Sequence, residues 1–261
     1  MDLVFKGVNM GRLDDRVIII TGGAAGIGRA FADGYVREGA SVVLADINGE
    51  AAEASAIEIN EAGGNALALQ VDVSDQIQTE FMASETIKHF GKIDGLVNNA
   101  AIAIRVQHTR APLEEIPVDE FDRMLAVNLK GVFLSTRAVL PHMKERKYGK
   151  IINMSSGTYF NGRANLVHYV ASKGGVIAIT RVLSREVGDW NITVNSIAPG
   201  LTASETEEHD IEQFAARIPD RSIKRIEVPE DLVGAGIFFI SKESDFITGQ
   251  TLIVDGGVVL N

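Results

Sequence analysis

The sequence contains no cysteine and no long apolar run. Without cysteine the chain has no disulfide, no thiolate nucleophile and no cysteine metal site, and we expect no metal. No apolar run reaches the roughly 18 residues of a membrane-spanning helix. Residues 1–14 lack the apolar stretch of a signal peptide and suggest a loosely held tail. These absences favour a cytoplasmic protein that makes no membrane contact.

Positive charge is also scarce. The chain has 25 Lys and Arg against 35 Asp and Glu, a net charge of −10, which argues against nucleic acid as a partner. Its 261 residues are 46% hydrophobic, enough for the core of one large α/β domain or two small ones. No linker, repeat or low-complexity segment divides it, so we expect one domain over residues 1–261.

A glycine-rich turn follows the first apolar run. The run 16–21 (RVIIIT) is typical of a parallel strand that is covered on both faces. Gly22, Gly26, Ile27 and Gly28 come next, and a helical pattern follows them. Small residues let the backbone approach a pyrophosphate, whose charge the helix amino terminus favours. The spacing is GxxxGxG rather than GxGxxG, and glycine turns also simply join strands to helices.

Asp46 ends the second expected strand, over residues 41–45. An acid at about this distance from Gly28 accepts hydrogen bonds from the ribose diol of an adenosine and repels a 2′-phosphate. No Arg or Lys lies in the glycine turn or directly after Asp46, where Ile47 follows. We therefore expect NAD rather than NADP, with an ordinary strand-end Asp as the alternative.

Two more strands, over 66–71 and 95–97, end in polar and small residues. Cofactor contacts are expected from the residues that follow them: Asp72, Val73, Asn99 and Ala100. Asp72 could hold the adenine amino group or cap the next helix, and the run NNAA (98–101) suits a cofactor contact or a plain turn.

Strands recur at roughly 25-residue intervals with helices between them, which predicts a right-handed parallel sheet. The remaining helices are expected over 29–38, 49–62, 75–90, 117–147 (bent or ended near Pro141) and 229–240, and the remaining strands over 150–153, 191–197 and 250–254.

Tyr169 and Lys173 lie four residues apart in a helical pattern, NLVHYVASKGGVIAIT (165–180). Positions i and i+4 share one face of a helix, so the phenol and the ammonium would lie side by side. A neighbouring positive charge lowers the pKa of a tyrosine from its ordinary value near 10. The pair would then act as a proton acceptor nearer neutral pH. Because YxxxK is common by chance, a surface Tyr and Lys is the alternative.

Ser156 and Asn128 complete the candidate catalytic residues. Ser156 follows the strand 150–153, and the loop between it and Tyr169 is long enough to bring its hydroxyl beside the phenol. Asn128 is a poor helix former in mid-helix, and its amide could hold a water chain to Lys173. A helix cap and a satisfied polar residue are the ordinary alternatives.

Taken together, these motifs resemble the short-chain dehydrogenase/reductase family over about residues 16–257. The resemblance rests on TGGAAGIG (21–28), Asp46, DV (72–73), NNAA (98–101), Asn128, Ser156, YVASK (169–173), PG (199–200) and ITGQTLIVDGG (247–257). The one departure is Ala101, where the family usually has glycine, and it puts nothing catalytic in doubt. The resemblance implies a Rossmann-type, doubly wound parallel sheet of about seven strands and a homotetramer. It also implies a catalytic tetrad, Asn128, Ser156, Tyr169 and Lys173.

The implied reaction is hydride transfer between a secondary alcohol carbon and a nicotinamide. Ser156 would bond the substrate oxygen and Tyr169 would exchange a proton with it. Lys173 would lower the pKa of Tyr169 and bind the nicotinamide ribose, so Tyr169 and Lys173 also count as cofactor residues. Asn128 would support a relaying water. Further cofactor contacts are expected from Pro199, Gly200, Thr202 and Ser204.

Three segments should shape the substrate pocket: 102–111, 157–168 and 202–222, the last as a mobile helical lid. Candidate contacts are Ala103, Arg105, Gly157, Thr158, Tyr159 and Arg163. The basic residues there (Arg105, His108, Arg110 and Arg163) could bind an anionic group. Solvated arginines or salt bridges between subunits are the commoner use of such residues.

Apolar residues in the same segments favour a different substrate. Tyr159, Phe160, Leu166 and Val167 suit an apolar or aromatic alcohol, and INMSSGTYF and VHYVASK resemble NAD-dependent aryl secondary-alcohol dehydrogenases of the family. A sugar, a polyol or a hydroxy acid is as plausible.

Two other functions stay open. One is an NADPH-dependent 3-oxoacyl-[acyl-carrier-protein] reductase, against which Asp46 argues. The other is a dinucleotide-binding sensor or scaffold without turnover, against which the intact tetrad argues. Whatever the function, the long helices over 117–147 and 165–189 resemble the family's dimerising pair, and we expect four subunits.

Overall fold

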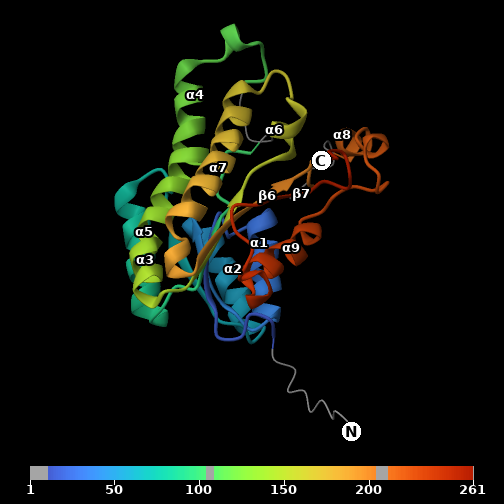
Figure 1. Cartoon of the computed structure of the whole chain (residues 1–261). Helices are drawn as coiled ribbons and strands as arrows, with labels where there is room; N and C mark the ends of the chain where they lie inside the picture. Colours follow the sequence, from blue (N-terminus) through green and yellow to red (C-terminus); the bar gives the residue numbers. More distant parts are fainter. Residues whose placement is uncertain (1–10, 104–108, 204–210, 261) are drawn as a thin grey trace.

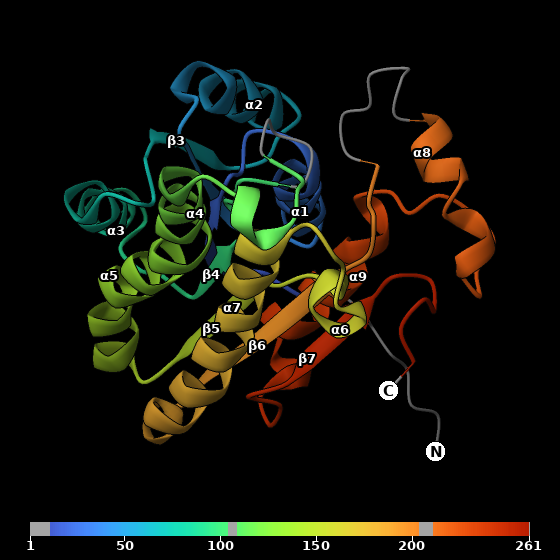
Figure 2. The same ribbon diagram turned by 90° about the horizontal axis from the view of Figure 1, so that it is seen from above.

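The computed structural model describes residues 11–103, 109–203 and 211–260. Within these residues seven strands form one parallel sheet in the order β3-β2-β1-β4-β5-β6-β7 (Figures 1 and 2). The strands are β1 (Val17–Thr21), β2 (Ser41–Asp46), β3 (Ala66–Gln70), β4 (Gly95–Asn98), β5 (Gly149–Met154), β6 (Ile192–Pro199) and β7 (Thr251–Val254). The predicted fold class is confirmed.

Helices cover both faces of the sheet. They are α1 (Gly26–Arg37), α2 (Gly49–Glu61), α3 (Gln76–Phe90), α4 (Val118–Leu125), α5 (Gly131–Arg146), α6 (Gly157–Asn161), α7 (Val167–Glu186), α8 (Ile211–Ala215) and α9 (Glu230–Ile240). Buried side chains of α1, α2 and α9 pack on one face, and those of α3, α5 and α7 on the other. None of the described helices is both long enough and apolar enough to cross a bilayer.

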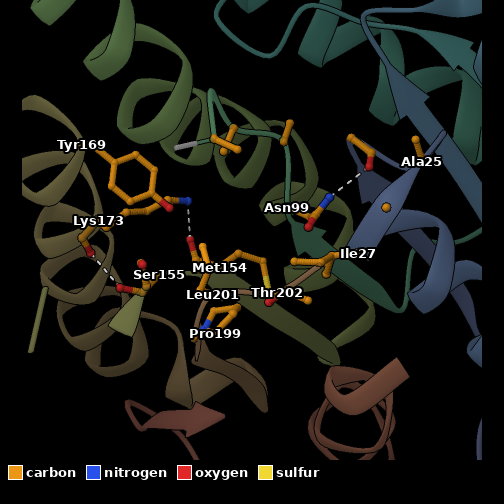
Figure 3. A pocket seen from close by; sticks show the side chains of 17 residues that line it. Ala25, Ile27, Asn99, Met154, Ser155, Tyr169, Lys173, Pro199, Leu201 and Thr202 are labelled. Carbon is orange, nitrogen blue, oxygen red and sulfur yellow. Dashed lines mark hydrogen bonds between the residues drawn. The ribbon is translucent and has the colours of Figure 1, made fainter. Parts of the chain in front are cut away.

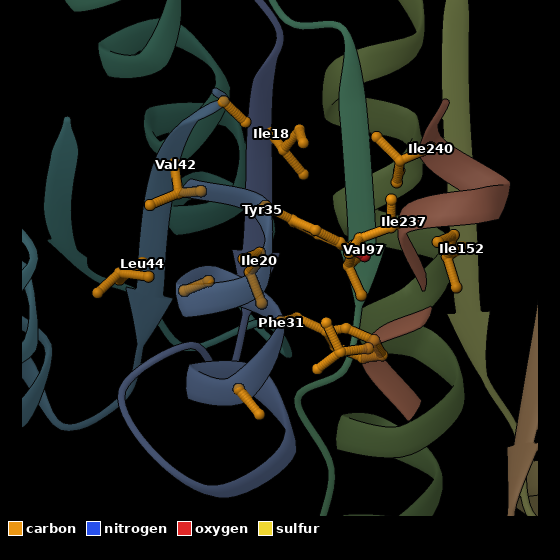
Figure 4. Close-up of a cluster of buried hydrophobic side chains, with 14 of the residues drawn as sticks. Ile18, Ile20, Phe31, Tyr35, Val42, Leu44, Val97, Ile152, Ile237 and Ile240 are labelled. Carbon is orange, nitrogen blue, oxygen red and sulfur yellow. The ribbon is translucent and has the colours of Figure 1, made fainter. Parts of the chain in front are cut away.

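The strand β1 shows why its sequence is a continuous apolar run. Ile18 and Ile20 pack on the face that α1 and α9 cover, and Ile19 packs on the opposite face (Figure 4). All three are fully buried, and burying a side chain of this size contributes about 1.5–3 kcal/mol. On the α1 side, the rings of Phe31 and Tyr35 stack with centroids 5.6 Å apart.

The strand register brings four distant segments to one edge of the sheet. Thr21 lies opposite Ala45 on β2 and opposite Asn98 on β4. Asn98 in turn lies opposite Asn153 on β5. The residues that follow β1, β2, β4 and β5 therefore leave the sheet side by side. The strand order reverses beside β1, and a crevice at this place is where open α/β sheets bind ligands.

The long predicted helix over 117–147 is continuous but not uniform. A π-helical turn, Ala126–Lys130, joins α4 to α5. The expected end near Pro141 is wrong, because Pro141 lies inside α5 and the helix runs on to Arg146. Val139 and Met143, on either side of the proline, are fully buried against the sheet. Their packing outweighs the cost of about 3 kcal/mol that a proline brings to a helix interior.

Residues 11–14 are part of the fold, so the predicted tail is shorter than expected. Leu13 is fully buried, and its backbone N–H donates to the Glu38 carbonyl at 2.9 Å. Arg12 pairs with Glu243 at 2.8 Å. The rest of the predicted tail, residues 1–10, lies outside the described residues.

Candidate active site

A pocket opens at the carboxyl edge of the sheet (Figure 3). It is lined by Gly22, Ala25, Gly26, Ile27, Asn99, Ala100, Ala101, Ala103, Met154, Ser155, Ser156, Tyr169, Lys173, Pro199, Gly200, Leu201 and Thr202. Most of the predicted cofactor residues and three of the four predicted catalytic residues thus face one cavity, which we call the catalytic pocket.

The glycine turn forms one wall of this pocket. Gly22 has a positive φ of 63°, and a Cβ built on Gly28 would lie only 2.0 Å from the Gly22 carbonyl oxygen. The Asn99 side-chain amide donates to the same carbonyl at 2.9 Å. The residue before α1 is Ala25, and no described side chain caps the amides of the first turn of α1. Those N–H groups are available for a phosphate.

Asp46 lies at the end of β2, outside the lining of the catalytic pocket. Its two oxygens accept hydrogen bonds from the Ala24 amide at 3.1 Å and the Asn48 amide at 3.0 Å. These contacts fix the carboxylate, and each oxygen keeps a further acceptor position. The neighbouring Ile47 side chain is 67% exposed.

Asp72 and Val73 serve the local structure. Asp72 accepts from the Ser74 amide and hydroxyl at 2.8 and 2.7 Å. The helix cap predicted as one use of Asp72 belongs to Asp75, which accepts two amides of the first turn of α3. Val73 is buried and packs against the start of α5, where a Cβ built on Gly131 would lie 2.8 Å from its side chain.

Tyr169 and Lys173 lie together on α7 and are both buried. The Lys173 ammonium is 5.8 Å from the centre of the Tyr169 ring and donates to the Met154 carbonyl at 2.8 Å (Figure 3). The Ser155 hydroxyl donates to the Lys173 carbonyl at 2.9 Å. The end of β5 thus fixes the lysine at both its backbone and its side chain.

Burial dominates the electrostatics of this pair. Burial lowers the pKa of Lys173 to about 8. Burial also raises the pKa of Tyr169, and a hydrogen bond with Ser156 offsets part of that rise. Burial and Ser156 are the causes of this shift, so the predicted lowering of the pKa of Tyr169 by Lys173 stays a prediction. The net rise comes from desolvation, because taking a phenolate out of water costs more than one hydrogen bond recovers.

Asn128 lies in the π-helical turn and outside the lining of the pocket. Its side-chain oxygen accepts from the Ile102 amide at 2.7 Å, and its amide donates to the Ile102 carbonyl at 3.1 Å and to the Ser172 hydroxyl at 3.3 Å. The side chain therefore ties the segment after 98–101 to α7. Its predicted water chain to Lys173 stays a prediction.

Ser156 has two structural roles beside Tyr169. Its hydroxyl is the N-cap of α6 and accepts from the Thr158 amide at 3.2 Å and from the Thr158 hydroxyl at 2.9 Å. The helix cap suggested from the sequence is therefore present, and Ser156 also acts on the pKa of Tyr169.

The predicted substrate residues divide between two places. Ala103 lines the catalytic pocket, whereas Gly157, Thr158 and Arg163 line a second pocket beside it. Tyr159 is 44% exposed. Arg105 and the predicted cofactor residue Ser204 lie outside the described residues. Thr202 lines the catalytic pocket and donates to a Glu227 carboxylate oxygen at 2.7 Å.

A chain of contacts beside Tyr169 was missed from the sequence. His168 is fully buried, and its Nε2 is 3.0 Å from a Glu120 carboxylate oxygen. Glu120 also accepts from the Thr109 amide at 2.6 Å and the Thr109 hydroxyl at 2.8 Å. Burial acts to raise the pKa of Glu120, and these hydrogen bonds outweigh it, so the pKa is lowered. No local pattern could reveal a contact between residues 48 positions apart.

Comparison with known proteins identifies the family. A family model described as short chain dehydrogenase matches residues 16–214. The chain belongs to this family. It is 41% identical over 259 residues to sorbitol dehydrogenase of Cereibacter sphaeroides, covering 94% of this chain and 98% of that protein. It is 39% identical to 5-keto-D-gluconate 5-reductase of Escherichia coli K12, covering 93% and 95%.

A solved structure of the short chain dehydrogenase family also matches closely. The 3-ketoacyl-(acyl-carrier-protein) reductase from Brucella melitensis, complexed with NADH, superposes with a TM-score of 0.87 at 33% identity. The match covers 95% of this chain and all of that one. The family resemblance drawn from the motifs is confirmed.

Proposed function

We propose that this short chain dehydrogenase is an NAD(H)-dependent oxidoreductase that interconverts a secondary alcohol and its ketone. The observation that carries the proposal is the buried Tyr169 hydroxyl. The Ser156 hydroxyl acts on its pKa, Lys173 lies beside it, and all three side chains line the same pocket as the glycine turn. The seven strands share one sheet, which supports a single catalytic domain.

The side chains of the pocket account for the proton transfer. The substrate oxygen is placed between the hydroxyls of Ser156 and Tyr169. In oxidation Tyr169 accepts the proton of the alcohol, and in reduction it returns a proton to the ketone oxygen. Ser156 keeps a hydrogen bond to that oxygen in both directions. A nicotinamide supplies the hydride acceptor or donor when it is bound.

Lys173 supports the proton transfer without taking part in it directly. With a pKa of about 8, its ammonium is mainly protonated at neutral pH. The contact with the Met154 carbonyl holds that charge near the phenol, where it favours the phenolate that forms during oxidation. The same ammonium is proposed to bind the nicotinamide ribose, and Asn128 to support the water that relays the proton onward.

Two features support a dinucleotide, and NAD in particular. The uncapped amides of α1 suit a pyrophosphate, and Asp46 offers acceptors to a ribose diol. The first cation after the turn, Arg29, is bound to Asp33 and Glu58, each at 2.9 Å, rather than turned toward Asp46. A 2′-phosphate would then meet the Asp46 carboxylate without Arg29 to balance it.

The names of two relatives indicate which classes of substrate to test. One is named for sorbitol, a polyol, and one for 5-keto-D-gluconate, a keto acid. The similarity to a 3-ketoacyl-(acyl-carrier-protein) reductase keeps a 3-oxoacyl reductase as the second candidate. The sequence analysis predicted this second candidate as an NADPH-dependent enzyme. Asp46 argues against it, because its carboxylate would repel the 2′-phosphate of NADPH.

A screen of the purified protein tests the proposal. NAD⁺ and NADP⁺ are each supplied with panels of aryl alcohols, polyols and hydroxy acids, and reduced nicotinamide is followed by its absorbance. We expect turnover with NAD⁺ to exceed turnover with NADP⁺. Dinucleotide binding without turnover of any alcohol in these panels would favour the sensor or scaffold instead.

We also propose a homotetramer. An exposed apolar groove runs over α4, α5 and α7, and the Phe133 and Val182 side chains on these helices are 52% and 55% exposed. Near the carboxyl end, Phe246 and Leu260 are also exposed. Apolar surfaces of this kind mark contacts between proteins. A sedimentation mass of one chain at micromolar concentration would contradict the proposal. The cytoplasmic location and the lid over 202–222 stay predictions.

A further inference from the structure

A second pocket adjoins the catalytic pocket on the substrate side, and we call it the arginine pocket. It is lined by Gly157, Thr158, Asn161, Arg163, Pro199, Gly200, Leu201, Arg217, Asp220, Arg221, Asp255 and Val258. The two pockets meet along residues 199–201, which line both. Ser156 faces the first pocket and Thr158, which donates to it, faces the second. A molecule whose reacting oxygen lies at Ser156 therefore has the arginine pocket within reach.

Two of the three arginines in this pocket already have acidic partners. Arg217 pairs with Asp220 at 3.5 Å. Arg221 is buried, lies 3.6 Å from a Glu227 carboxylate oxygen and donates to the Leu201 carbonyl at 2.7 Å. The pocket's other acid, Asp255, accepts three backbone amides of the segment 257–259. It is therefore already satisfied.

Arg163 is different from both. Its side chain is half-buried, and it forms no side-chain hydrogen bond or ion pair with any residue in 11–103, 109–203 or 211–260. Burial, Arg217 and Arg110 all act to lower the pKa of Arg163, so positive charge accumulates around it. Because an arginine stays protonated at any working pH, the pocket holds a guanidinium that has no ion-pair partner among the described residues.

The chemistry of a lone guanidinium defines what would fit. Arginine presents a planar fork of N–H donors that matches a carboxylate with two parallel hydrogen bonds. A single guanidinium without a contacting acid matches the single charge of a carboxylate better than the double charge of a phosphate. Half-burial strengthens the attraction relative to an exposed pair.

We propose that the arginine pocket binds a carboxylate of the alcohol substrate through Arg163, so that the substrate is a hydroxy acid rather than a neutral alcohol. This inference rests on the proposed function, because it assigns the substrate class of the same site. Arg163 would then be a specificity residue that holds the far end of the molecule while Ser156 and Tyr169 act on the near end.

Matched pairs of alcohols test this assignment. D-gluconate and D-sorbitol differ only in whether one terminal carbon is a carboxylate or a hydroxymethyl group. The aryl pair 4-(1-hydroxyethyl)benzoate and 1-phenylethanol differs in a carboxylate against a hydrogen at the para position of the ring. For the wild-type enzyme with NAD⁺, we expect kcat/KM to be higher for the charged member of at least one pair.

Variants locate the effect on one side chain. Arg163→Gln should lower kcat/KM for the charged member by about tenfold or more, a difference of about 1.4 kcal/mol, and leave the neutral member within about twofold. Arg217→Gln should have a smaller effect, because Asp220 already neutralises that charge. Arg37→Gln, an exposed arginine at the far end of α1, is the matched control and should change neither member.

Binding measured without turnover separates this inference from the proposed function. D-gluconate and 4-(1-hydroxyethyl)benzoate are titrated calorimetrically into the NADH complex of each variant. Arg163-dependent binding in a protein that oxidises none of the alcohols would support the arginine pocket and contradict the proposed function. Oxidation of neutral alcohols with no advantage for the charged member would contradict the arginine pocket alone.

The chain's own acids are the competing explanation for Arg163. Glu205, Glu207, Glu208 and Asp210 follow Thr202 in the sequence and lie outside the described residues. If one of them neutralises Arg163, Arg163→Gln will lower the thermal unfolding temperature and reduce turnover of both members of a pair equally. That result would overturn the proposal.

Discussion

Replacing Lys173 by methionine should raise the stability of this protein at neutral pH while abolishing its activity. Burial lowers the pKa of Lys173 to about 8 from the ordinary 10.5. Keeping this buried ammonium protonated at pH 7 therefore costs the folded state about 3 kcal/mol. Methionine removes that cost but leaves the Met154 carbonyl without its donor, a loss of about 1–3 kcal/mol. The variant should be more stable than the wild type by about 0–2 kcal/mol at pH 7.

The dependence on pH makes this prediction sharper. Between pH 8 and 10.5 the unfolded chain still binds a proton on Lys173 and the folded protein has released it. Stability rises with pH wherever the unfolded state binds more protons. The wild type should therefore gain about 3 kcal/mol relative to the variant over this interval, and at high pH the variant should be the less stable of the two.

Urea unfolding at pH 7, 8, 9 and 10 measures the difference in the free energy of unfolding between the two proteins. Equal protomer concentrations are required, because a subunit equilibrium would add its own contribution. Lys88→Met, an exposed lysine on α3, is the matched control for loss of a lysine. A Lys173→Met difference that stays constant with pH would refute the reasoning. A variant that is much less stable than the wild type at pH 7 would refute it as well.

Three further substitutions test the glycine turn, the choice of cofactor and the contact between Asn128 and Ile102. Gly28→Ala should weaken NADH binding at least about tenfold and destabilise the protein by about 1–3 kcal/mol, because its Cβ would meet the Gly22 carbonyl oxygen at 2.0 Å. Gly188→Ala, where a Cβ meets open space, should do neither when both variants are measured by calorimetry and urea unfolding. Asp46→Asn should lower the ratio of kcat/KM for NAD⁺ over NADP⁺ by about tenfold, since it removes the charge that repels a 2′-phosphate; an unchanged ratio would remove Asp46 from cofactor choice. Asn128→Ala should cost about 2–4 kcal/mol of unfolding free energy, because it leaves the backbone N–H and the carbonyl of Ile102 without partners; a loss below about 0.5 kcal/mol would contradict this role.

Most of the sheet could be predicted because its strands are short buried runs bounded by turn residues. Val17–Thr21 is buried along its whole length and was visible as a continuous apolar segment. Gly149–Met154 is also buried throughout, although Lys150 and Asn153 flank its apolar pair Ile151 and Ile152. The alternative of a helix end near Pro141 rested on a local rule that packing of Val139 and Met143 overrides. Leu13 could not be recognised as buried, since a single apolar residue carries no periodicity.

The catalytic pocket was predictable to the level of residue positions but not of energies. The spacing of Tyr169 and Lys173 places both on one face of α7, and the structure has them there. The spacing does not reveal that both are buried, and burial raises the pKa of the tyrosine instead of lowering it. The π-helical turn around Asn128 had one signal, an asparagine in mid-helix, but its partner Ile102 could be found only in three dimensions.

The central claim is that the Tyr169 hydroxyl exchanges the proton with the substrate oxygen while a nicotinamide exchanges the hydride. Tyr169→Phe removes this hydroxyl and keeps the ring that packs in the pocket. We expect its kcat for alcohol oxidation to fall by about 10²–10⁴-fold, with the calorimetric Kd for NADH within about threefold of the wild type. A variant that binds NADH normally and still oxidises alcohols at a rate close to the wild type would contradict the claim.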